Sequence, residues 1–431
     1  MFECGHCIGM RLLERFGRKI DRFVNANVAE RFVMLCRASF NYLLWPLCFI
    51  VLAPTGVLAL VLARAMEPLF RIRVGMLEYG RIGHLAANTE VYLRRQAMRT
   101  DRRREFHVLV SGPPANLQLL TMIRRRVPVT QNILVQRLSS SLRSRTAWSP
   151  VWIDLPMNTN EYFEFNNAPS QLSFTEEEKE RGSALLAEIG VPPGQPFVCF
   201  LIRDKAYLDA TFKHRSRESW SYHDFRDSDI RNCLPAVEAL AAQGLWALRM
   251  GAVVERAVGS NHPRVIDYAT RFRSDFGDIF LLGHCKFYLG DTSGPWIVAS
   301  GLGVPVACAN CVPMSVIPLT ERDLSIPKRH WSVEKGRFLT FREIIESGAD
   351  GWNKTHLYKE AGIEVIENTA EEVLALTLEM NSRLDGTWVG TDEDEVLQAR
   401  YRALFPPGHR CYGFPSRIGA EFLRQNRELL D

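Results

Sequence analysis

One short polar turn is the part of the sequence best suited to chemistry. It runs from Gly290 to Gly294 and reads Gly-Asp-Thr-Ser-Gly. The apolar residues 287–289 precede it, and residues 296–302, which follow, have the composition of a helix. The apolar residues 304–306 come next, so the order predicts a strand, a turn, a helix and a second strand. The apolar residues 279–282 predict a further buried strand just before this unit.

A turn that opens a helix at the end of a strand is suited to binding an anion. The first backbone N–H groups of the helix and the positive end of its dipole favour a phosphate there. Thr292 and Ser293 add hydroxyl groups, and Gly294 allows a ligand to approach the backbone closely. The alternative is an ordinary tight turn in which Thr292 or Ser293 caps the helix.

A second candidate follows the apolar residues 197–202, which we predict to form a strand. Arg203 and Asp204 come directly after it, and Tyr207 lies three residues further on. Ligands of open α/β sheets bind outside the carboxyl ends of the strands. The guanidinium of Arg203 would therefore be placed to hold a diphosphate with two hydrogen bonds. A surface salt bridge is the alternative.

A third candidate precedes a predicted helix at residues 85–95. Arg81, Gly83 and His84 lie in the loop before this helix. His84 would sit at the helix N-terminus, where a neutral imidazole could act as a base or a hydrogen-bond partner. A packing or capping histidine is the alternative. Asn116 precedes another predicted helix, at 117–126, and is either a ligand of the same cleft or the cap of that helix.

Two further groups complete the candidate residues. Residues 211–232 are polar and aromatic without a strand pattern, and we expect a cleft loop there that closes with Arg226, Asp227, Arg231 and Asn232. Asp227 and Asp229 have the spacing of a metal-binding D-x-D motif, but arginines flank them on both sides. Arg249 and Gly251 end a predicted strand at 246–249, which adds them to the donor side of the site.

These pieces together resemble one bacterial family of glycosyltransferases of the GT-B type, distantly similar to the fucosyltransferases. The stretch 290–306 resembles the donor-side turn of GT-B enzymes. Other matching pieces lie at 81–90, 114–116, 200–207, 225–232, 249–251 and 416–423. The resemblance covers roughly residues 74–430 and rests on the order and spacing of motifs that are each weak alone.

The resemblance implies two Rossmann-like α/β lobes with a cleft between them. We expect an acceptor lobe at 74–190, a turn-rich linker near 191–196 and a nucleotide-sugar lobe at 191–431, whose last helix, 417–430, crosses back to the first lobe. Arg203, Arg249, Gly251 and residues 292–294 would bind the donor diphosphate. His84, Asp204 or Asp227 would act as the base, and no metal or cofactor would be required because arginines and helix dipoles offset the leaving-group charge.

The first 73 residues predict membrane attachment. Residues 11–38 have the spacing of a basic amphipathic helix, and residues 42–63 contain 22 consecutive residues without a charge. Residues 1–145 hold 23 lysines and arginines against 9 acidic residues, whereas the whole chain is only +4. Basic residues flank the apolar segment on both sides and Pro54 interrupts it, so we expect a re-entrant hairpin kinked at Pro54 in preference to a full span. Nothing in the pattern indicates nucleic-acid binding.

The sequence as a whole therefore predicts a glycosyltransferase on the cytoplasmic face of a bacterial inner membrane. It would move a hexose or deoxyhexose from a nucleotide sugar to a lipid-linked or polysaccharide acceptor. A GT-B sugar-nucleotide epimerase is one alternative, although epimerases act on soluble substrates and have no need of an anchor. A non-catalytic membrane scaffold that keeps the fold is the other. Several of the ten cysteines lie in apolar runs, as in proteins of a reducing compartment.

Overall fold

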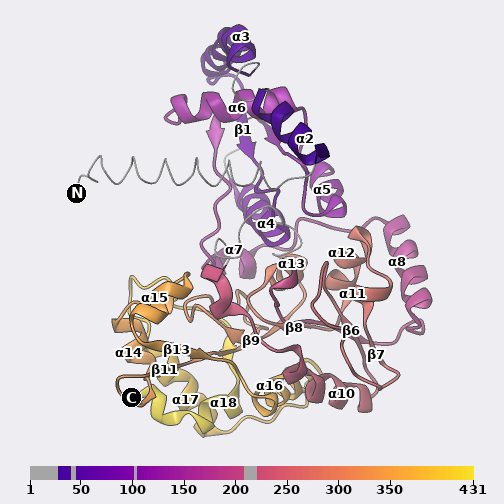
Figure 1. Cartoon of the computed structure of the whole chain (residues 1–431), viewed down its shortest axis with the longest axis vertical. Helices are drawn as coiled ribbons and strands as arrows, with labels where there is room; N and C mark the ends of the chain where they lie inside the picture. The colour runs from indigo at the N-terminus through magenta and orange to yellow at the C-terminus, as the bar shows by residue number, and fades with distance from the viewer. Residues whose placement is uncertain (1–27, 40–44, 101–103, 208–220) are drawn as a thin grey trace. The chain divides into compact units, whose positions relative to one another are not determined.

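The structure is a computed structural model of the whole chain, and it describes residues 28–39, 45–100, 104–207 and 221–431 (Figure 1). The chain divides into two compact units. The first comprises residues 1–73, 104–106 and 132–152, and the second comprises residues 74–103, 107–131 and 153–431. The sequence-predicted amphipathic helix falls partly outside the described residues, because only its second half, α2 (Val28–Ser39), is described.

The first unit also contains α3 (Trp45–Ala65) and α6 (Ile133–Thr146). α3 is one continuous helix that includes Pro54, so the hairpin expected at this proline is wrong. Thr55 donates its hydroxyl to the carbonyl of Leu52, a polar contact beside the proline. Among the described residues, α3 is the one helix long and apolar enough to cross a membrane. The apolar run 133–136 is the first turn of α6, and α6 packs against α3.

A four-stranded sheet has the strand order β3-β2-β1-β4. Its strands are β1 (Arg71–Met76), β2 (Glu105–Val110), β3 (Val129–Thr130) and β4 (Trp152–Ile153). β2 and β3 are parallel. The helices that follow in the chain are α4 (Ile82–Met98), α5 (Leu117–Arg124), α7 (Tyr162–Asn167) and α8 (Glu176–Ile189). Thr175 and Glu178 form the predicted capping box of α8, which confirms that helix.

A second sheet has seven strands, all parallel to their neighbours, in the order β14-β10-β9-β8-β5-β6-β7. They are β5 (Phe197–Leu201), β6 (Trp246–Arg249), β7 (Val265–Ile266), β8 (Tyr288–Gly290), β9 (Val306–Cys311), β10 (Leu324–Pro327) and β14 (Arg417–Ile418). The chain moves from β5 to β7 in one direction and then from β8 to β10 in the other. The topological switch point therefore lies between β5 and β8, where open α/β sheets bind their ligands.

Both faces of this sheet are buried, as the nearly continuous apolar strands predict. The main helices around it are α10 (Leu234–Ala242), α12 (Asp275–His284), α13 (Gly294–Gly301) and α16 (Ala370–Leu384). In β5, Val198 and Phe200 join one hydrophobic cluster with side chains of α10 and α16. Phe197 and Cys199 join the other cluster, with side chains of α12 and α13. Alternate side chains of β5 therefore pack against α10 and α16 on one face of the sheet and against α12 and α13 on the other.

Smaller elements lie between β10 and the C-terminus. A three-stranded antiparallel sheet is formed by β11 (Arg329–Ser332), β12 (Arg337–Phe338) and β13 (Ile363–Ile366). The remaining helices are α11 (Tyr268–Arg271), α14 (Phe341–Glu346), α15 (Thr355–Glu360), α17 (Asp392–Ala403) and α18 (Ala420–Gln425). Short 3₁₀ helices are η3 (Ser221–Arg226), η4 (Ile230–Cys233), η5 (Ala349–Gly351) and η6 (Arg427–Leu430).

Two sequence predictions about these elements need correction. The apolar run 279–282 is part of helix α12, which Ser274 caps at its N-terminus, and is not a strand. The predicted final helix 417–430 is divided into β14, α18 and η6. Because β14 pairs with β10, and α18 packs against α16 and α17, this segment belongs to the seven-stranded sheet and its helices.

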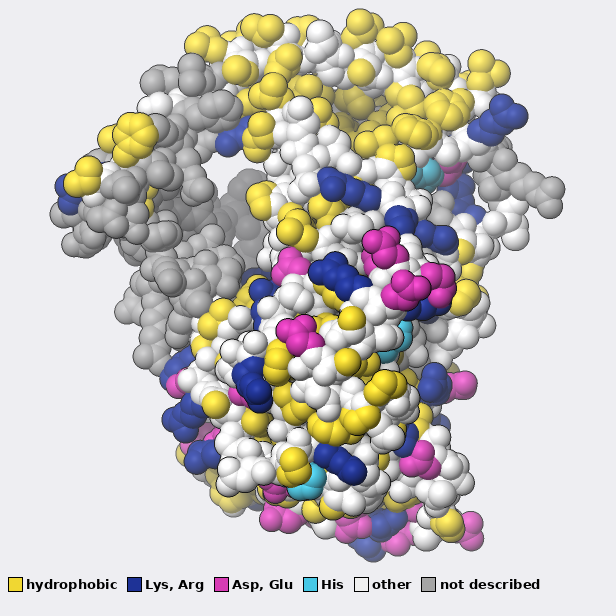
Figure 2. All heavy atoms as spheres, turned by 90° about the vertical axis from the view of Figure 1, so that its right-hand side faces the viewer, with side chains coloured by type: hydrophobic (Ala, Val, Ile, Leu, Met, Phe, Trp, Pro, Cys, Tyr) yellow, Lys and Arg dark blue, Asp and Glu magenta, His cyan; other side chains and the backbone are white. Residues whose placement is uncertain are grey.

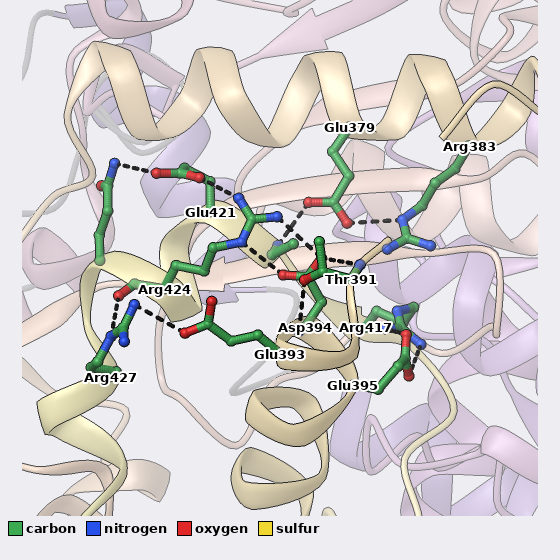
Figure 3. A network of polar contacts seen from close by, with 12 residues as sticks. Glu379, Arg383, Thr391, Glu393, Asp394, Glu395, Arg417, Glu421, Arg424 and Arg427 are labelled. Carbon is green, nitrogen blue, oxygen red and sulfur yellow. Dashed lines mark hydrogen bonds and ion pairs between the residues drawn. The ribbon is translucent and has the colours of Figure 1, made fainter. Parts of the chain in front are cut away.

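An ion-pair network holds the C-terminal segment in place (Figure 3). Arg424 of α18 reaches Asp394 of α17 through two hydrogen bonds, of 2.8 and 3.1 Å. The same Asp394 carboxylate completes the capping box with Thr391 at the start of α17. The Glu379 carboxylate accepts the Arg383 guanidinium at 2.8 Å and the Ala420 backbone N–H at 2.7 Å. Each of these two carboxylates therefore joins two segments of the chain.

Helices α4 and α13 pack together closely, and their first turns meet at two glycines. A Cβ built on Gly83 would lie 3.0 Å from the Gly294 Cα, and one built on Gly294 would lie 2.8 Å from the Ile82 Cγ2. Further along, buried Arg94 pairs with Glu90 at 3.0 Å and donates to the carbonyl of Gly301 at 3.1 Å. The missing side chain of Gly294 thus makes room for α4, which is a different reason for glycine from the predicted approach of a ligand.

Candidate functional site

A cavity of about 560 Å³ opens in the second unit, outside the carboxyl ends of strands from both large sheets. Its lining comes from the segments after β1, β2, β5, β6, β8 and β9. Ten of the predicted site residues line it: Arg81, Gly83, His84, Arg203, Asp204, Tyr207, Gly251, Thr292, Ser293 and Gly294. The fold thus brings together residues that are more than 200 positions apart in the sequence.

Asp291 organises the switch point at the base of this cavity. Its side chain is almost fully buried, with one oxygen accepting the Arg203 backbone N–H at 2.6 Å and the other accepting the Ser293 N–H at 3.0 Å. The carboxylate therefore ties the end of β5 to the turn that opens α13. The sequence placed Asp291 in the turn but gave it no role, because only the fold places β5 beside β8.

The turn after β8 holds its own shape with most of its polar groups. The Thr292 hydroxyl donates to the Val312 carbonyl at 3.0 Å, and the guanidinium of Arg226 donates to the Thr292 carbonyl. The N-cap Ser293 makes no side-chain capping bond to α13. The first backbone N–H groups of a helix have no intrahelical acceptor, so the start of α13 offers donors and a positive dipole end to the cavity.

Arginines make the cavity wall beside this turn strongly positive. Arg81, Arg203 and Arg226 all line the cavity, together with His223. Burial, with Arg203, Arg226 and Arg81 nearby, lowers the pKa of His223 to about 3. Burial and the neighbouring Arg203 also lower the pKa of Arg226 to about 10. Burial is the first cause of both pKa shifts, and the positive charges of the neighbouring arginines act in the same direction.

Asp227 lies behind this wall and outside the cavity lining. Its Oδ1 is 3.1 Å from the Nε of Arg203. Burial raises the pKa of Asp227 to about 6, although Arg203 opposes the rise. Lys328 supports the same segment by donating to the carbonyls of Phe225 and Asp227 at 3.1 and 2.8 Å. The Lys328 side chain is itself buried.

His84 is the third residue of α4 and lines the cavity from the other sheet. Its Nδ1 is 3.2 Å from the Oδ1 of Asn88, one turn later. The amide nitrogen of Asn88 donates to the carbonyl of Leu155, which turns the amide oxygen towards His84. Nδ1 must then be the protonated nitrogen of the neutral ring, and Nε2 carries the lone pair. The ring is therefore held in the tautomer that a general base requires.

Asp204 and Gly251 line the cavity, but other contacts within the protein already fix the carboxylate of Asp204 and the backbone of Gly251. One oxygen of Asp204 accepts the Ala206 N–H and the other accepts the Glu255 N–H, each at 2.9 Å. Gly251 has a φ of 144°, and a Cβ there would meet Val254 at 2.5 Å. Both residues fix loop conformations at the rim.

The other predicted site residues lie outside the cavity lining. Arg249 is buried against Asp267 at 3.3 Å and donates to the Arg256 carbonyl. Asn116 caps α5 by accepting the Leu119 N–H at 3.0 Å, the capping role that the sequence left open. Arg231 is exposed and pairs with Asp229 at 2.8 Å. Asn232 donates to the Asn368 carbonyl at 3.4 Å.

Two further residues line the cavity. The sequence placed Arg226 in the cleft loop without giving it a binding role, and it did not single out His223. Both lie in η3, in a segment without hydrophobic periodicity. Their position depends on the contact of Arg226 with the Thr292 carbonyl, 66 residues away in the sequence. Among the described residues, no group of three or more histidine, cysteine or acidic side chains is placed to hold a metal ion.

No protein-family model matches the sequence, and a search of the curated proteins finds no match. Among solved structures, the chain is similar to ADP-heptose lipopolysaccharide heptosyltransferase II of E. coli, with 13% identity over 60% of this chain and 90% of that chain, at a TM-score of 0.40. A glycosyl transferase of family 9 from Veillonella parvula gives 9% identity over 55% and 80%, at a TM-score of 0.35.

A third similar structure is the iron-containing heptosyltransferase TibC in complex with ADP-D-β-D-heptose. It gives 12% identity over 55% of this chain and 57% of that chain, at a TM-score of 0.28. Similarity at these scores bears on neither the activity nor the substrate of this chain. The predicted similarity to fucosyltransferases stays a prediction.

Proposed function

We propose that this chain is a glycosyltransferase that takes its sugar from a nucleotide-sugar donor. The main support is the switch point of the seven-stranded sheet, where the N-terminus of α13 and three arginine side chains border one cavity. A diphosphate is the ligand group that matches this combination, because it accepts hydrogen bonds from helix N–H groups and from guanidinium groups at the same time.

Arg203 is the residue that we assign to the diphosphate first. Its backbone is fixed by Asp291 and its side chain lines the cavity, only partly neutralised by Asp227. Arg226, fixed to the Thr292 carbonyl, and Arg81 would add charge around the leaving group. Positive groups held in place before the reaction stabilise the charge that develops as the nucleoside diphosphate departs. This role needs no metal ion.

His84 is the base in this proposal. Its Nε2 would take the proton from an acceptor hydroxyl while that oxygen attacks the anomeric carbon and the bond from this carbon to the diphosphate oxygen breaks. Asp204 is less suited, because both of its oxygens accept backbone N–H groups. Asp227 is less suited as well, because it faces Arg203 from outside the cavity lining. A positioned base contributes typically about 10²–10⁴-fold to a rate.

We place the acceptor among lipid-linked or polysaccharide sugars on the side of His84. The observation behind this part of the proposal is the long apolar helix α3 in the same chain. An epimerase would share the donor site but would release a free sugar or an altered nucleotide sugar. A non-catalytic scaffold would bind neither donor nor acceptor in this cavity.

A nucleotide-sugar screen on the purified full chain tests the proposal. We expect one donor to raise the melting temperature, because a ligand that binds only the folded state stabilises it by mass action. The same donor should release its nucleoside diphosphate slowly in water and faster with an acceptor. The matched control for Arg203→Ala is Arg231→Ala, which removes an exposed arginine outside the cavity. If no nucleotide sugar stabilises the chain, or if the two variants lose equal stabilisation, the proposed donor site is wrong.

A further inference from the structure

The outer face of α3 is apolar and exposed along its whole length. The side chains of Leu47, Ile50, Val51, Leu58, Val61 and Leu62 are between 54% and 71% exposed. Figure 2 shows hydrophobic side chains gathered over the part of the first unit that carries α3. An apolar surface of this length, on a helix whose charged residue is Arg64 in the last turn, marks a binding surface for lipid or for another apolar partner.

The inner face of α3 is covered by α6 at the middle of the helix. A Cβ on Gly56 would lie 2.6 Å from Leu142 and 3.3 Å from Leu138, so the glycine allows α6 to pack closely there. Two arginines of α6 reach the first turns of α3. The Arg145 guanidinium is 5.0 Å from the centre of the Phe49 ring, and that of Arg137 is 5.7 Å from the Trp45 ring.

This packing is incompatible with α3 as a helix that spans the membrane. A helix of 21 residues is about 31 Å long, the thickness of the hydrocarbon core, so Gly56 would lie near the bilayer centre. Leu138 and Leu142 would lie there with it, together with Arg143 and the serines of α6. Arginines and several serines at that depth are strongly disfavoured.

We propose that α3 and α6 form a helix pair that lies in one leaflet of an anionic membrane, with the outer face of α3 among the acyl chains. The positive charge of the first unit favours binding to an anionic membrane, because its described residues include nine arginines and three glutamates. Trp148, directly after α6, is 81% exposed, and Leu69, after α3, is 84% exposed. Aromatic residues at this position suit the boundary between headgroups and acyl chains.

The amphipathic helix α2 adds a second apolar face to the same unit. Val28, Phe32 and Leu35 recur at helical spacing and are all more than half exposed. Basic helices with one apolar face bind in the membrane interface, and their affinity rises with the fraction of anionic lipid. The preference for an anionic leaflet over a protein partner rests on this excess of arginine.

Vesicle flotation of the full chain measures the binding. We expect the chain to float with vesicles of phosphatidylcholine and phosphatidylglycerol at 3:1, and less with phosphatidylcholine alone. The double variant Val51→Glu/Leu58→Glu should lower the bound-to-free ratio by about tenfold or more, and Trp148→Ala by about two- to fivefold. Val389→Glu is the matched control, since Val389 is 84% exposed in the second unit, and it should float like the parent.

Depth measurements separate the in-plane pair from a spanning helix. A fluorophore would be attached to single cysteines at Val51, Leu58 or Leu62, in a chain with Cys4, Cys7, Cys36 and Cys48 replaced by serine. Quenching by lipids labelled at different depths should place all three positions at a similar shallow depth. A maximum depth at Leu58 would mean a spanning helix and would overturn the proposal. So would a chain that ignores vesicles but forms a dimer that the double variant dissociates, because the occupant would then be a second copy.

Discussion

Two clusters of arginines and carboxylates in this molecule use the same side chains in opposite ways. In the C-terminal network of Figure 3, the Asp394 carboxylate accepts two bonds from Arg424 and also the Thr391 backbone N–H. The bonds from Arg424 lower the pKa of Asp394 to about 2. Beside the cavity, Asp227 faces Arg203 at 3.1 Å, and burial raises its pKa to about 6.

The difference lies in how completely each carboxylate is partnered. Both oxygens of Asp394 accept hydrogen bonds, so its charge stabilises the contact between α17 and α18. Asp227 is half-buried with Arg203 as its ionic partner, and burial, together with the arginines nearby, lowers the pKa of His223. An excess of positive charge that the protein itself leaves uncompensated is a property of ligand sites. The following predictions test whether the cluster beside the cavity acts mainly in ligand binding and the C-terminal cluster mainly in stability.

The largest effect is expected on the cavity side, from His84→Ala. Turnover should fall about 10²–10⁴-fold, because the proton acceptor is lost, while the dissociation constant of the donor should change little. Steady-state kinetics with isothermal titration of the donor measures both quantities. A variant that turns over like the parent would show that another group accepts the proton.

The next largest effect separates the clusters directly. Arg203→Ala should weaken donor binding by roughly ten- to a hundredfold, as expected for the loss of a charge-assisted hydrogen bond, and should leave the melting temperature nearly unchanged. Arg424→Ala should do the reverse, lowering the melting temperature without altering the dissociation constant. The comparison fails if both variants lose binding and stability in the same proportion.

A third prediction concerns the pH dependence of the C-terminal network. Asp394→Asn should reduce the free energy of unfolding at pH 7 by about 1–3 kcal/mol. Because the folded-state pKa is lowered, this contribution is present above the ordinary value near 4 and is lost as the pH falls towards about 2. Denaturant unfolding at several pH values should show the deficit shrinking over that range. Glu393→Gln, in the same turn of α17, is the control; it removes only an exposed ion pair with Arg427 and should have a much smaller effect.

The smallest effect concerns Asp227. Protonation below about pH 6 removes the negative charge of Asp227. The ion pair between Asp227 and Arg203 then no longer competes with the binding of an anion to Arg203. The affinity for a nucleotide sugar should therefore rise by about two- to fivefold between pH 7 and pH 5. In Asp227→Asn the affinity should already be high at pH 7 and should stay constant. Titration calorimetry with a donor whose diphosphate is esterified at both ends avoids titration of the ligand itself.

The sequence predicted the elements whose signals are local. The apolar runs of β5, β6 and β8 and the capping box of α8 were all found, since each depends on neighbouring residues. The run 279–282 was misread because four apolar residues fit a strand as well as a buried helix. The informative signal was Ser274, which caps α12 five positions before the run begins.

The sequence predicted those residues of the candidate site that directly follow a strand. Arg203 and the turn 292–294 were assigned to one cavity because carboxyl ends of parallel strands meet at one edge of a sheet. Arg249 also ends a strand, but its side chain pairs with Asp267 in the interior. The two residues are 18 positions apart, so the sequence around Arg249 does not reveal this pair. Arg226 reaches the cavity through a contact that only the folded chain creates.

The contact of α4 with α13 has a consequence for how the chain folds. It joins residues 207 positions apart where Arg94 meets the Gly301 carbonyl. Neither helix can complete its packing until the other is in place, so α4, α13 and the strands of the second unit beside them should reach the native state in one cooperative step. Contacts between such distant residues are slow to form, because a long loop must close before they contribute any stability. The helix pair that borders the cavity should therefore be among the last parts to assemble, and binding competence should appear only with the final folding phase.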